Sequence, residues 1–292
     1  MVNPAGDSGP GRRDRAQLRI VGIGLGDPGH LTVEAVEALR SAAFALVTVK
    51  REGDPLAAAR RAILDRYAPG LPVVEVQDPE RDRSERATAT AGAYEGVVSD
   101  WHEARAAAWE SVLTAAFALP PSPDLRRDVQ FLGGDSAQLG ANLAEAGGTG
   151  VVLVWGDPAF YDSTIRVVER ILARGRLAFA WDVLPGISAL QLLAARHRIV
   201  LHEVGQPIAV TTARRLREAV ASGADNVLVF LTGRLDLAGL EDWTIWWGAN
   251  LGAESERLVS GRVGDVVPAI ESARAGAKAA AGWVMDLYLL RR

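Results

Sequence analysis

The chain has 292 residues, 49% of them hydrophobic, and a formal net charge of −4. This charge argues against a nucleic-acid partner, because a broad nucleic-acid-binding surface shows as an excess of basic residues. The chain has no cysteine, which excludes disulfides and thiolate chemistry. No apolar segment approaches the ~20 residues that cross a bilayer, and the opening residues contain no hydrophobic secretory signal. We therefore expect a cytoplasmic protein without a membrane partner, and a flexible tail at residues 1–17.

A chain of this length can bury the cores of two α/β domains. Between residues 18 and 200, hydrophobic segments bounded by Gly, Pro or Asp alternate with segments of helical period. This alternation is typical of a largely parallel sheet flanked by helices. A proline- and glycine-rich segment at 119–150 predicts a surface insertion with one short helix. The strands expected here are 18–23, 44–49, 72–76, 151–155 and 178–183.

A second alternation of strands and helices begins after EVGQP at 203–207. The strands expected there are 208–211, 227–231, 244–247, 258–260 and 283–290. The last of them is dense in apolar residues, which predicts a buried strand rather than an edge strand. We therefore expect an N-terminal domain at 18–204 and a C-terminal domain at 205–292.

The first expected strand leads into a glycine-rich loop, LGDPGH. Gly24, Gly26 and Gly29 match the G-x-G-x-x-G spacing of a dinucleotide-binding turn. However, Pro28 lacks an N–H group, and Asp27 would place a negative charge beside the phosphates. The second strand ends at basic residues instead of the acid that binds a ribose. A basic strand end could suit a 2′-phosphate, so a nicotinamide site stays an alternative.

The strand, Gly-Asp-Pro and helix arrangement recurs at 151–164, and a third turn with Pro and Gly at its apex lies within 180–199. In the third turn, Ser188 and Gln191 are spaced as a capping box that starts a helix. Turns at the carboxyl ends of neighbouring strands predict one ligand crevice. A Gly-Asp-Pro turn presents carbonyl oxygens and a carboxylate, so we expect the ligand to carry a positive charge.

The segments VGIGLGDPGHLT, WGDPAFYDST, LPGISALQ and GWVMDLYLLRR resemble the motifs of the tetrapyrrole methylases. Other segments, among them AARHRIVLHEVGQP, DPERDR and DWHEARA, are similar to the subgroup that makes precorrin-6A. The resemblance covers the chain from about residue 18 to the C-terminus. The resemblance implies an α/β fold that consists of two α/β domains of the tetrapyrrole methylase type. It places the active site in the cleft between the two domains. It also implies a homodimer.

The activity that the resemblance implies is that of an S-adenosyl-L-methionine-dependent methyltransferase of cobalamin biosynthesis. Such an enzyme methylates ring carbon 1 of precorrin-5, a tetrapyrrole polycarboxylate, and releases the acetyl group of that carbon as acetate. One alternative is a sister precorrin methyltransferase that acts at another ring position. Another is a non-catalytic tetrapyrrole-binding relative, favoured only by Ala213 and Thr232, which depart from the expected TTGRRL and LDG.

The family pattern also implies which residues contact the cofactor. A sulfonium is a fixed positive charge, so carbonyls and a carboxylate are suitable partners. Asp157 could instead cap its own turn, and Phe160 and Tyr161 could be core residues. The residues implied are Gly156, Asp157, Phe160 and Tyr161 on one side of the cofactor, Ile187 and Ser188 on another, and the backbone of Gly248, Ala249 and Asn250 at the adenine.

Removal of the acetyl group requires a base that activates water and a donor for the developing oxyanion. The candidates are Asp27, Tyr161 and Asp162, with His30 and His102 as further possibilities. Asp27 leads because its loop is expected to face the cleft. The alternative for Asp27 is a loop aspartate that binds its own backbone.

The many arginines suit a polycarboxylate ligand, because guanidinium groups bind carboxylates in bidentate fashion. Arg214 and Arg215 are the candidates for substrate carboxylates, since they follow a strand end at the domain boundary. Arg60 and Arg61 are expected on a solvated helix face.

No metal site is expected. His197 and His202 have a spacing that fits no common site.

Overall fold

The computed structural model describes residues 16–50, 53–82, 91–117, 131–132, 148–233 and 235–292. The chain divides into two compact units, Met1–Gly186 and Ile187–Arg292. Most of the expected tail at 1–17 and most of the expected insertion at 119–150 lie outside the described residues. The division at 186–187 precedes the boundary that the sequence suggested at 204–205.

The first unit contains a six-stranded sheet in the order β4-β3-β2-β5-β1-β6. All pairs are parallel except β3 with β4. The five expected strands of this region are confirmed within a few residues, whereas the short β4 was not predicted. The strands are β1 (Gln17–Gly22), β2 (Phe44–Val49), β3 (Val73–Gln77), β4 (Phe131–Leu132), β5 (Thr149–Val154) and β6 (Ala180–Leu184).

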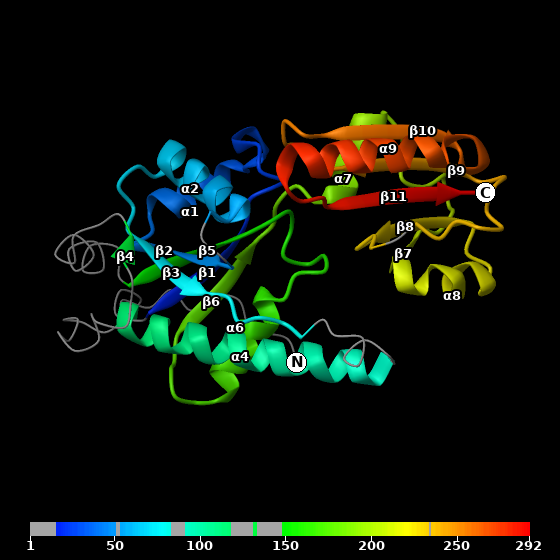
Figure 1. Ribbon diagram of the computed structural model, residues 1–292. Coiled ribbons are helices and arrows are strands. Elements are labelled where there is room, and N and C mark those ends of the chain that lie inside the picture. Colours follow the sequence, from blue (N-terminus) through cyan, green and yellow to red (C-terminus); the bar gives the residue numbers. More distant parts are fainter. Residues whose placement is uncertain (1–15, 51–52, 83–90, 118–130, 133–147, 234) are drawn as a thin grey trace. The chain divides into compact units, whose positions relative to one another are not determined.

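Helices cover both faces of this sheet (Figure 1). One face carries α1 (Val33–Arg40) and α2 (Pro55–Tyr67), and the other carries α4 (Ala91–Phe117) and α6 (Thr164–Ala173). Because strand side chains alternate between faces, Val151 and Leu153 of β5 pack toward α1 and α2. Val152 and Val154 pack toward α4 and α6. Burial of both faces explains the continuous apolar run of β5.

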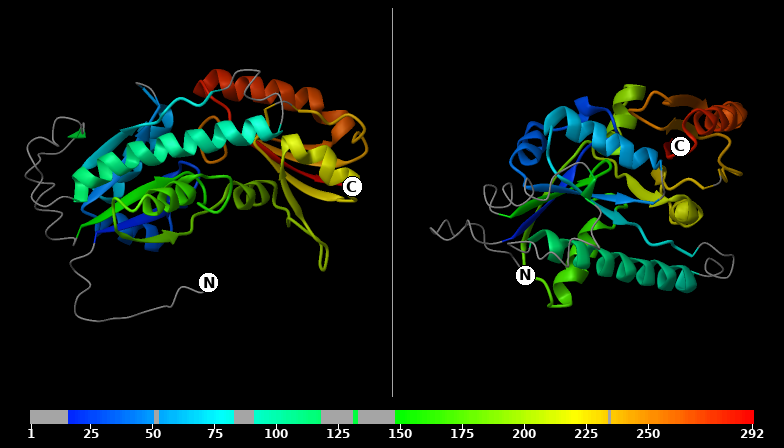
Figure 2. Two further views of the ribbon diagram at one scale, coloured as in Figure 1. Left: turned by 90° about the horizontal axis from the view of Figure 1, so that it is seen from below. Right: turned by 60° about the vertical axis from the view of Figure 1, so that its left-hand side comes forward.

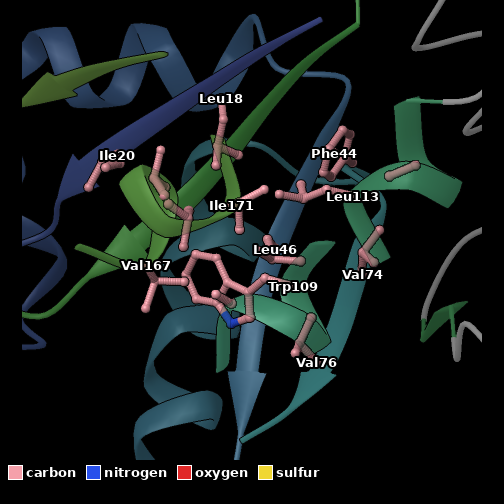
Figure 3. Packing of buried hydrophobic residues seen from close by; sticks show 14 of the residues in the cluster. Leu18, Ile20, Phe44, Leu46, Val74, Val76, Trp109, Leu113, Val167 and Ile171 are labelled. Atoms are coloured by element: carbon pink, nitrogen blue, oxygen red, sulfur yellow. The ribbon is translucent and has the colours of Figure 1, made fainter. Parts of the chain in front are cut away.

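Trp109 of α4 lies at the centre of the core between the sheet and α6 (Figure 3). Its side chain is 1% exposed. Leu46 of β2 and Val167 of α6 belong to the same cluster. A buried indole contributes a large apolar area, so Trp109 fixes the position of α4 on the sheet.

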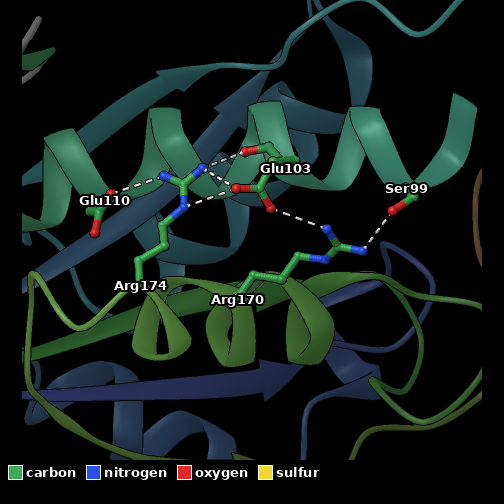
Figure 4. Close-up of polar contacts among 5 residues, drawn as sticks. All are labelled: Ser99, Glu103, Glu110, Arg170 and Arg174. Atoms are coloured by element: carbon green, nitrogen blue, oxygen red, sulfur yellow. Dashed lines mark hydrogen bonds and ion pairs between the residues drawn. The ribbon is translucent and has the colours of Figure 1, made fainter. Parts of the chain in front are cut away.

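Ion pairs join α4 to α6, which run side by side (Figure 2). Arg174, the C-cap residue of α6, contacts Glu103 at 2.6 Å and Glu110 at 2.9 Å, both on α4. Arg170 contacts Glu103 at 3.1 Å and donates to Ser99 at 3.1 Å (Figure 4). The hydrogen bonds from Arg174 and Arg170 lower the pKa of Glu103. Arg174 therefore holds the two helices together on the solvent side of the core.

The second unit contains a five-stranded sheet in the order β10-β9-β11-β8-β7. The central position of β11 confirms that the last strand is buried rather than at an edge. Helices α7 (Ala189–His197), α8 (Leu216–Ala221) and α9 (Val263–Ala281) pack against this sheet. Its strands are β7 (Ala209–Thr212), β8 (Asn226–Phe230), β9 (Thr244–Ala249), β10 (Arg257–Arg262) and β11 (Asp286–Arg291).

Helix α7 belongs to the second unit because it contacts β9, β10 and β11. Leu193 of α7 lies so close to Gly248 of β9 that a Cβ on this glycine would meet it at 2.9 Å. The neighbouring Trp247 points to the opposite face, where it belongs to the cluster with Ile270 of α9. Within the described part of the chain, no helix is both long and apolar enough to cross a membrane.

Candidate functional site

The turns after β5, β1 and β6 lie side by side at the carboxyl edge of the first sheet. Gly24 and Gly156 form an isolated bridge, in which Gly156 N donates to Gly24 O at 2.7 Å and Gly24 N to Gly156 O at 3.3 Å. Ile23 N donates to Val154 O at 2.9 Å. A phosphate-binding nest needs such N–H groups directed at the ligand. Their engagement within the protein argues against a dinucleotide site.

Glycine is required where these turns meet. A Cβ on Gly22 would lie 2.5 Å from the backbone nitrogen of Gly186, and one on Gly186 would collide with Gly156 O. A Cβ on Gly26, whose φ is +97°, would lie 2.5 Å from the ring of Trp155. The glycines therefore allow three strand ends to approach backbone to backbone.

Asp157 ties the second turn to the third. Its Oδ1 accepts a hydrogen bond from Ala159 N at 2.8 Å, and its Oδ2 accepts one from Gly186 N at 2.9 Å. Both carboxylate oxygens thus bind backbone amides of the first unit. Asp157 therefore stabilises its own turn, as the alternative explanation for this residue predicted. Its contact with a cofactor stays a prediction.

Phe160 and Tyr161 follow Asp157 and reach the surface. Phe160 is 38% exposed and Tyr161 is 45% exposed, so core packing is the wrong explanation for both. Tyr161 also has a φ of +52°, in the left-handed region that non-glycine residues rarely occupy. Strained backbone of this kind persists where surrounding contacts impose it, and it concentrates at functional sites.

Two candidate catalytic carboxylates lie on these turns. Asp27 is exposed, and its Oδ1 accepts from Gly29 N at 2.7 Å, which caps the short 3-10 helix η1 (Pro28–His30). Asp162 is half-buried, and its Oδ1 accepts from Thr164 N at 2.6 Å. Each of these hydrogen bonds uses one of the two carboxylate oxygens, so local capping and a catalytic role are compatible.

Sequence reasoning missed a buried cluster of charged groups beside this edge. Arg60 of α2 does not lie on a solvated face: its Nε donates to Leu153 O at 3.0 Å, and burial lowers its pKa. Arg105 of α4 and Asp78 after β3 form an ion pair of 2.8 Å. The segments DPERDR and DWHEARA, which supply Asp78 and Arg105, were the available signal.

His102 belongs to the same region of α4. It is 7% exposed, and its pKa is lowered first by burial and then by the charges of Arg170 and Arg105, while Asp162 raises it. The imidazole is therefore neutral at neutral pH. His30 lies at the end of η1, and its Nδ1 is buried without a hydrogen-bond partner among the described residues.

The implied cofactor residues on the second unit are largely engaged in its structure. Gly248 and Ala249 are buried and pair with β10 on one side and β11 on the other. Asn250 has a φ of +48°, and its side chain donates to Ser255 Oγ at 3.0 Å and accepts from Met285 N at 2.9 Å. Their contact with an adenine stays a prediction.

The third turn contains the expected capping box. Gln191 Oε1 accepts from both the backbone nitrogen and the hydroxyl of Ser188, at 2.8 Å and 2.9 Å. Ser188 is buried and Ile187 is half-buried. The predicted capping box is confirmed. The contact of Ile187 and Ser188 with a cofactor stays a prediction.

Arg214 and Arg215 lie in the short 3-10 helix η3 (Ala213–Arg215), directly after β7. Both side chains are exposed. Arg215 forms an ion pair with Glu218 at 2.7 Å. A solvent-exposed pair of this type contributes little to stability, so it can give way to a carboxylate ligand.

A polar network holds the loop that carries Thr232. Arg274 of α9 donates to Thr232 O at 2.9 Å and to Asp286 Oδ2 at 3.0 Å, and Trp247 Nε1 donates to the same Oδ2 at 3.1 Å. Burial raises the pKa of Asp286, which the charge of Arg274 opposes. The threonine at position 232 is itself buried, with its hydroxyl 3.4 Å from Asp286 O.

The described residues contain no cluster of three or more His, Cys, Asp or Glu side chains that could hold a metal. His197 Nε2 lies 3.0 Å from Trp247 O, and His202 Nδ1 lies 3.1 Å from Glu203 O. Both imidazoles thus contact backbone carbonyls.

The edge of the first sheet therefore offers the carboxylates of Asp27 and Asp162 and two exposed aromatic rings. This set of groups suits an organic cation with a flat ring, because carboxylates attract the charge and aromatic faces pack on the ring. S-adenosylmethionine has both features.

Comparison with known proteins agrees with this chemistry. The sequence profile of the Tetrapyrrole (Corrin/Porphyrin) Methylases matches residues 17–267. A precorrin-6A synthase [deacetylating] from Sinorhizobium sp. is 41% identical over 281 residues, which cover 94% of this chain and 95% of that protein.

Solved structures show the same fold. A cobalamin synthesis related protein from Corynebacterium diphtheriae has a TM-score of 0.70 and 31% identity, covering 94% of this chain and 98% of that one. A uroporphyrin-III C-methyltransferase from Thermus thermophilus, complexed with S-adenosylhomocysteine, has a TM-score of 0.50 and 18% identity, covering 94% and 92%. The profile match and the extent of the identity show that this chain belongs to the tetrapyrrole methylases.

Proposed function

We propose that this chain is an S-adenosylmethionine-dependent methyltransferase that converts precorrin-5 to precorrin-6A. In this reaction ring carbon 1 is methylated and its acetyl group is released as acetate. The observation that carries the proposal is the 41% identity to a deacetylating precorrin-6A synthase over nearly the whole of both chains. The tetrapyrrole methylases use S-adenosylmethionine as the methyl donor, and the groups on the first sheet edge fit this cofactor.

S-adenosylmethionine supplies an electrophilic methyl group on a positively charged sulfur. The protein's contribution to methyl transfer is alignment of that methyl with the nucleophilic ring carbon, an orientation effect that can be large. Phe160 and Tyr161 are exposed beside the turn of Gly156 and Asp157, which supports a role in packing against the cofactor. No base is needed for this step.

Deacetylation needs a base, and Asp27 and Asp162 are our candidates. In the proposed step, a carboxylate takes a proton from water, and the water oxygen attacks the acetyl carbonyl. The carbon–carbon bond then breaks, acetate leaves, and the electron pair passes to ring carbon 1, which attacks the methyl group. Tyr161 is a candidate donor to the developing oxyanion, because its side chain is 45% exposed at the same edge.

The substrate is a polycarboxylate, and Arg214 and Arg215 are our candidates for binding its carboxylates. Their support is exposure at the carboxyl end of β7 and a guanidinium geometry that matches carboxylates. Replacing each by Met should raise KM for the tetrapyrrole and leave the affinity for S-adenosylhomocysteine unchanged.

We further propose that the enzyme acts in the cytoplasm as a homodimer, without a nucleic-acid partner. The support is the family resemblance and the net charge of −4. Sedimentation at several protein concentrations would test the dimer.

A substrate panel tests the proposed function. The protein is incubated anaerobically with methyl-labelled S-adenosylmethionine and either precorrin-5 or a less methylated precorrin. We expect label to enter only the precorrin-5 sample. Labelling of another precorrin would indicate a sister methyltransferase, whereas binding of S-adenosylhomocysteine without any labelling would indicate a non-catalytic relative.

A further inference from the structure

Two segments far apart in the sequence meet in the first unit, and neither has a role in the function proposed above. Asp78 follows β3 in the segment 78–83, and Arg105 lies on α4 in the segment 100–106. The Nε of Arg105 contacts Asp78 Oδ1 at 2.8 Å. Their side chains are only 10% and 3% exposed, so the pair is buried.

The surroundings of Arg105 fix its orientation. Its guanidinium lies over the ring of Trp101 at 4.7 Å from the centroid and near that of Trp109 at 5.6 Å. Trp101 is in turn anchored by a hydrogen bond of 2.8 Å from its Nε1 to Pro79 O. A guanidinium held between indoles and a carboxylate has little rotational freedom, which suits it for directing its remaining N–H groups.

One of those N–H groups reaches the second turn. Arg105 Nη1 donates to the hydroxyl of Ser163, the residue before α6. The segment between Asp157 and Ser163 carries the exposed Tyr161 in its left-handed conformation. The carboxylate of Asp157 binds Ala159 N and Gly186 N at the start of this segment. The hydrogen bond from Arg105 binds Ser163 at its end.

A buried ion pair is weak evidence for stability, because the cost of removing two charges from water can exceed their attraction. Apolar residues of similar volume are often as stabilising as a buried ion pair or more so. The contact with Ser163 joins the pair to a backbone segment whose strained conformation must be imposed by surrounding contacts.

We propose that Asp78 and Arg105 are positioning residues that hold Ser163 and thereby set the orientation of Tyr161 and Asp162 for the reaction. This inference rests on the proposed function in that it assigns the reaction to the turn at 160–163. Asp78 and Arg105 are themselves not proposed to touch the substrate. The two residues thus connect α4 to the turn at the carboxyl edge of the first sheet.

The test begins with three single variants that differ in what they remove, and it adds a double variant and a conservative one. Ser163→Ala removes only the hydroxyl that accepts the hydrogen bond from Arg105. The hydrogen bond from Thr164 N to Asp162, at the start of α6, is retained. Arg105→Met removes the donor and retains an apolar side chain between the indoles. Arg174→Met is the matched control, because it breaks ion pairs between the same two helices without touching Ser163.

We expect Ser163→Ala and Arg105→Met to lower kcat by roughly ten- to a hundredfold, the size of effect that misplacement by about 1 Å can have. Hydrogen exchange of the amides at 159–164 should be faster in both variants. Combining the two substitutions should add little to either alone. Arg174→Met should lower Tm and leave kcat and this exchange unchanged. Arg105→Lys should restore part of kcat, because an ammonium can still donate to Ser163.

The exchange measurement also separates failure of this inference from failure of the proposed function. If the wild-type protein transfers no methyl group, the proposed function fails, and exchange at 159–164 still decides whether Arg105 restrains the turn. Wild-type kcat together with wild-type exchange in Ser163→Ala would overturn the inference. The same result for Arg105→Met, or an equal loss of kcat in Arg174→Met, would also overturn it.

Discussion

A hydrogen bond between Asp157 and Gly186 joins two turns: the backbone nitrogen of Gly186 donates to Asp157 Oδ2 at 2.9 Å. The two residues are far apart in the chain, and β1 lies between their strands in the sheet. This hydrogen bond makes the carboxyl edge of the first sheet one structural unit. The Gly-Asp-Pro motif at Asp157 therefore has a structural role, which is to join the second turn to the third.

Replacing Asp157 by Asn should destabilise the protein by about 1–3 kcal/mol, because an amide has a single oxygen and cannot accept from both Ala159 N and Gly186 N. Urea unfolding followed by circular dichroism measures the change. The matched control is Asp27→Asn, because asparagine caps as well as aspartate does. Equal stability of Asp157→Asn and wild type would show that the two hydrogen bonds of this carboxylate do not both contribute to stability.

Gly186→Ala should destabilise the protein by about 1–3 kcal/mol or more, because the added Cβ would collide with the carbonyl of Gly156 and the backbone of Gly22. Gly96→Ala provides the comparison. Gly96 is exposed on α4 and a Cβ there meets no atom within 4 Å, so we expect a gain of up to about 1 kcal/mol from helix propensity. Similar unfolding midpoints for the two variants would contradict the close packing of the turns.

Asp27→Asn should reduce the rate of product formation by about a hundredfold or more, the typical contribution of a general base. The affinity for S-adenosylhomocysteine, measured by calorimetry, should not change. The cap on Gly29 survives in asparagine, so Tm should also stay constant. A wild-type rate in this variant would remove Asp27 from the candidates and leave Asp162.

His102 should make stability depend on pH. Its folded-state pKa lies below the ordinary value of 6.5, because of burial and the charges of Arg170, Arg105 and Arg166, partly offset by Asp162. As pH falls through 6.5, the unfolded chain takes up a proton that the folded protein does not. The free energy of unfolding therefore decreases as pH falls from 7.5 toward 5.5.

His102→Gln cannot take up this proton, so its free energy of unfolding should fall less over the same pH range. His197, whose pKa burial also lowers, is retained in both proteins and cancels in the comparison. Urea titrations at several pH values give both slopes. Parallel curves for the two proteins would show that His102 is not held neutral in the folded state.

The sequence predicted the parts of this fold that depend on local pattern. The continuous apolar run of β5 and the turn residues around Asp157 identify a strand and its end without further information. The capping box of Ser188 and Gln191 was also predictable, because it depends on residues three positions apart. The central position of β11 followed from its dense apolar composition.

Features that depend on pairing between distant segments were not predictable in the same way. Arg60 was expected on a solvated helix face, but it bonds a carbonyl of β5, and nothing in the local pattern of α2 indicates this. The ion pair of Asp78 and Arg105 likewise needs the tertiary fold. Helix α7 was expected in the first unit because the second alternation of strands and helices begins only after EVGQP at 203–207.

The most direct test of the account is the ratio of acetate released to methyl groups transferred. The protein is incubated anaerobically with precorrin-5 and methyl-labelled S-adenosylmethionine, and both products are counted over time. The account predicts one acetate for each methyl group at every time point. Methyl transfer without acetate would contradict the deacetylating reaction, and with it the roles proposed for Asp27, Tyr161 and Asp162.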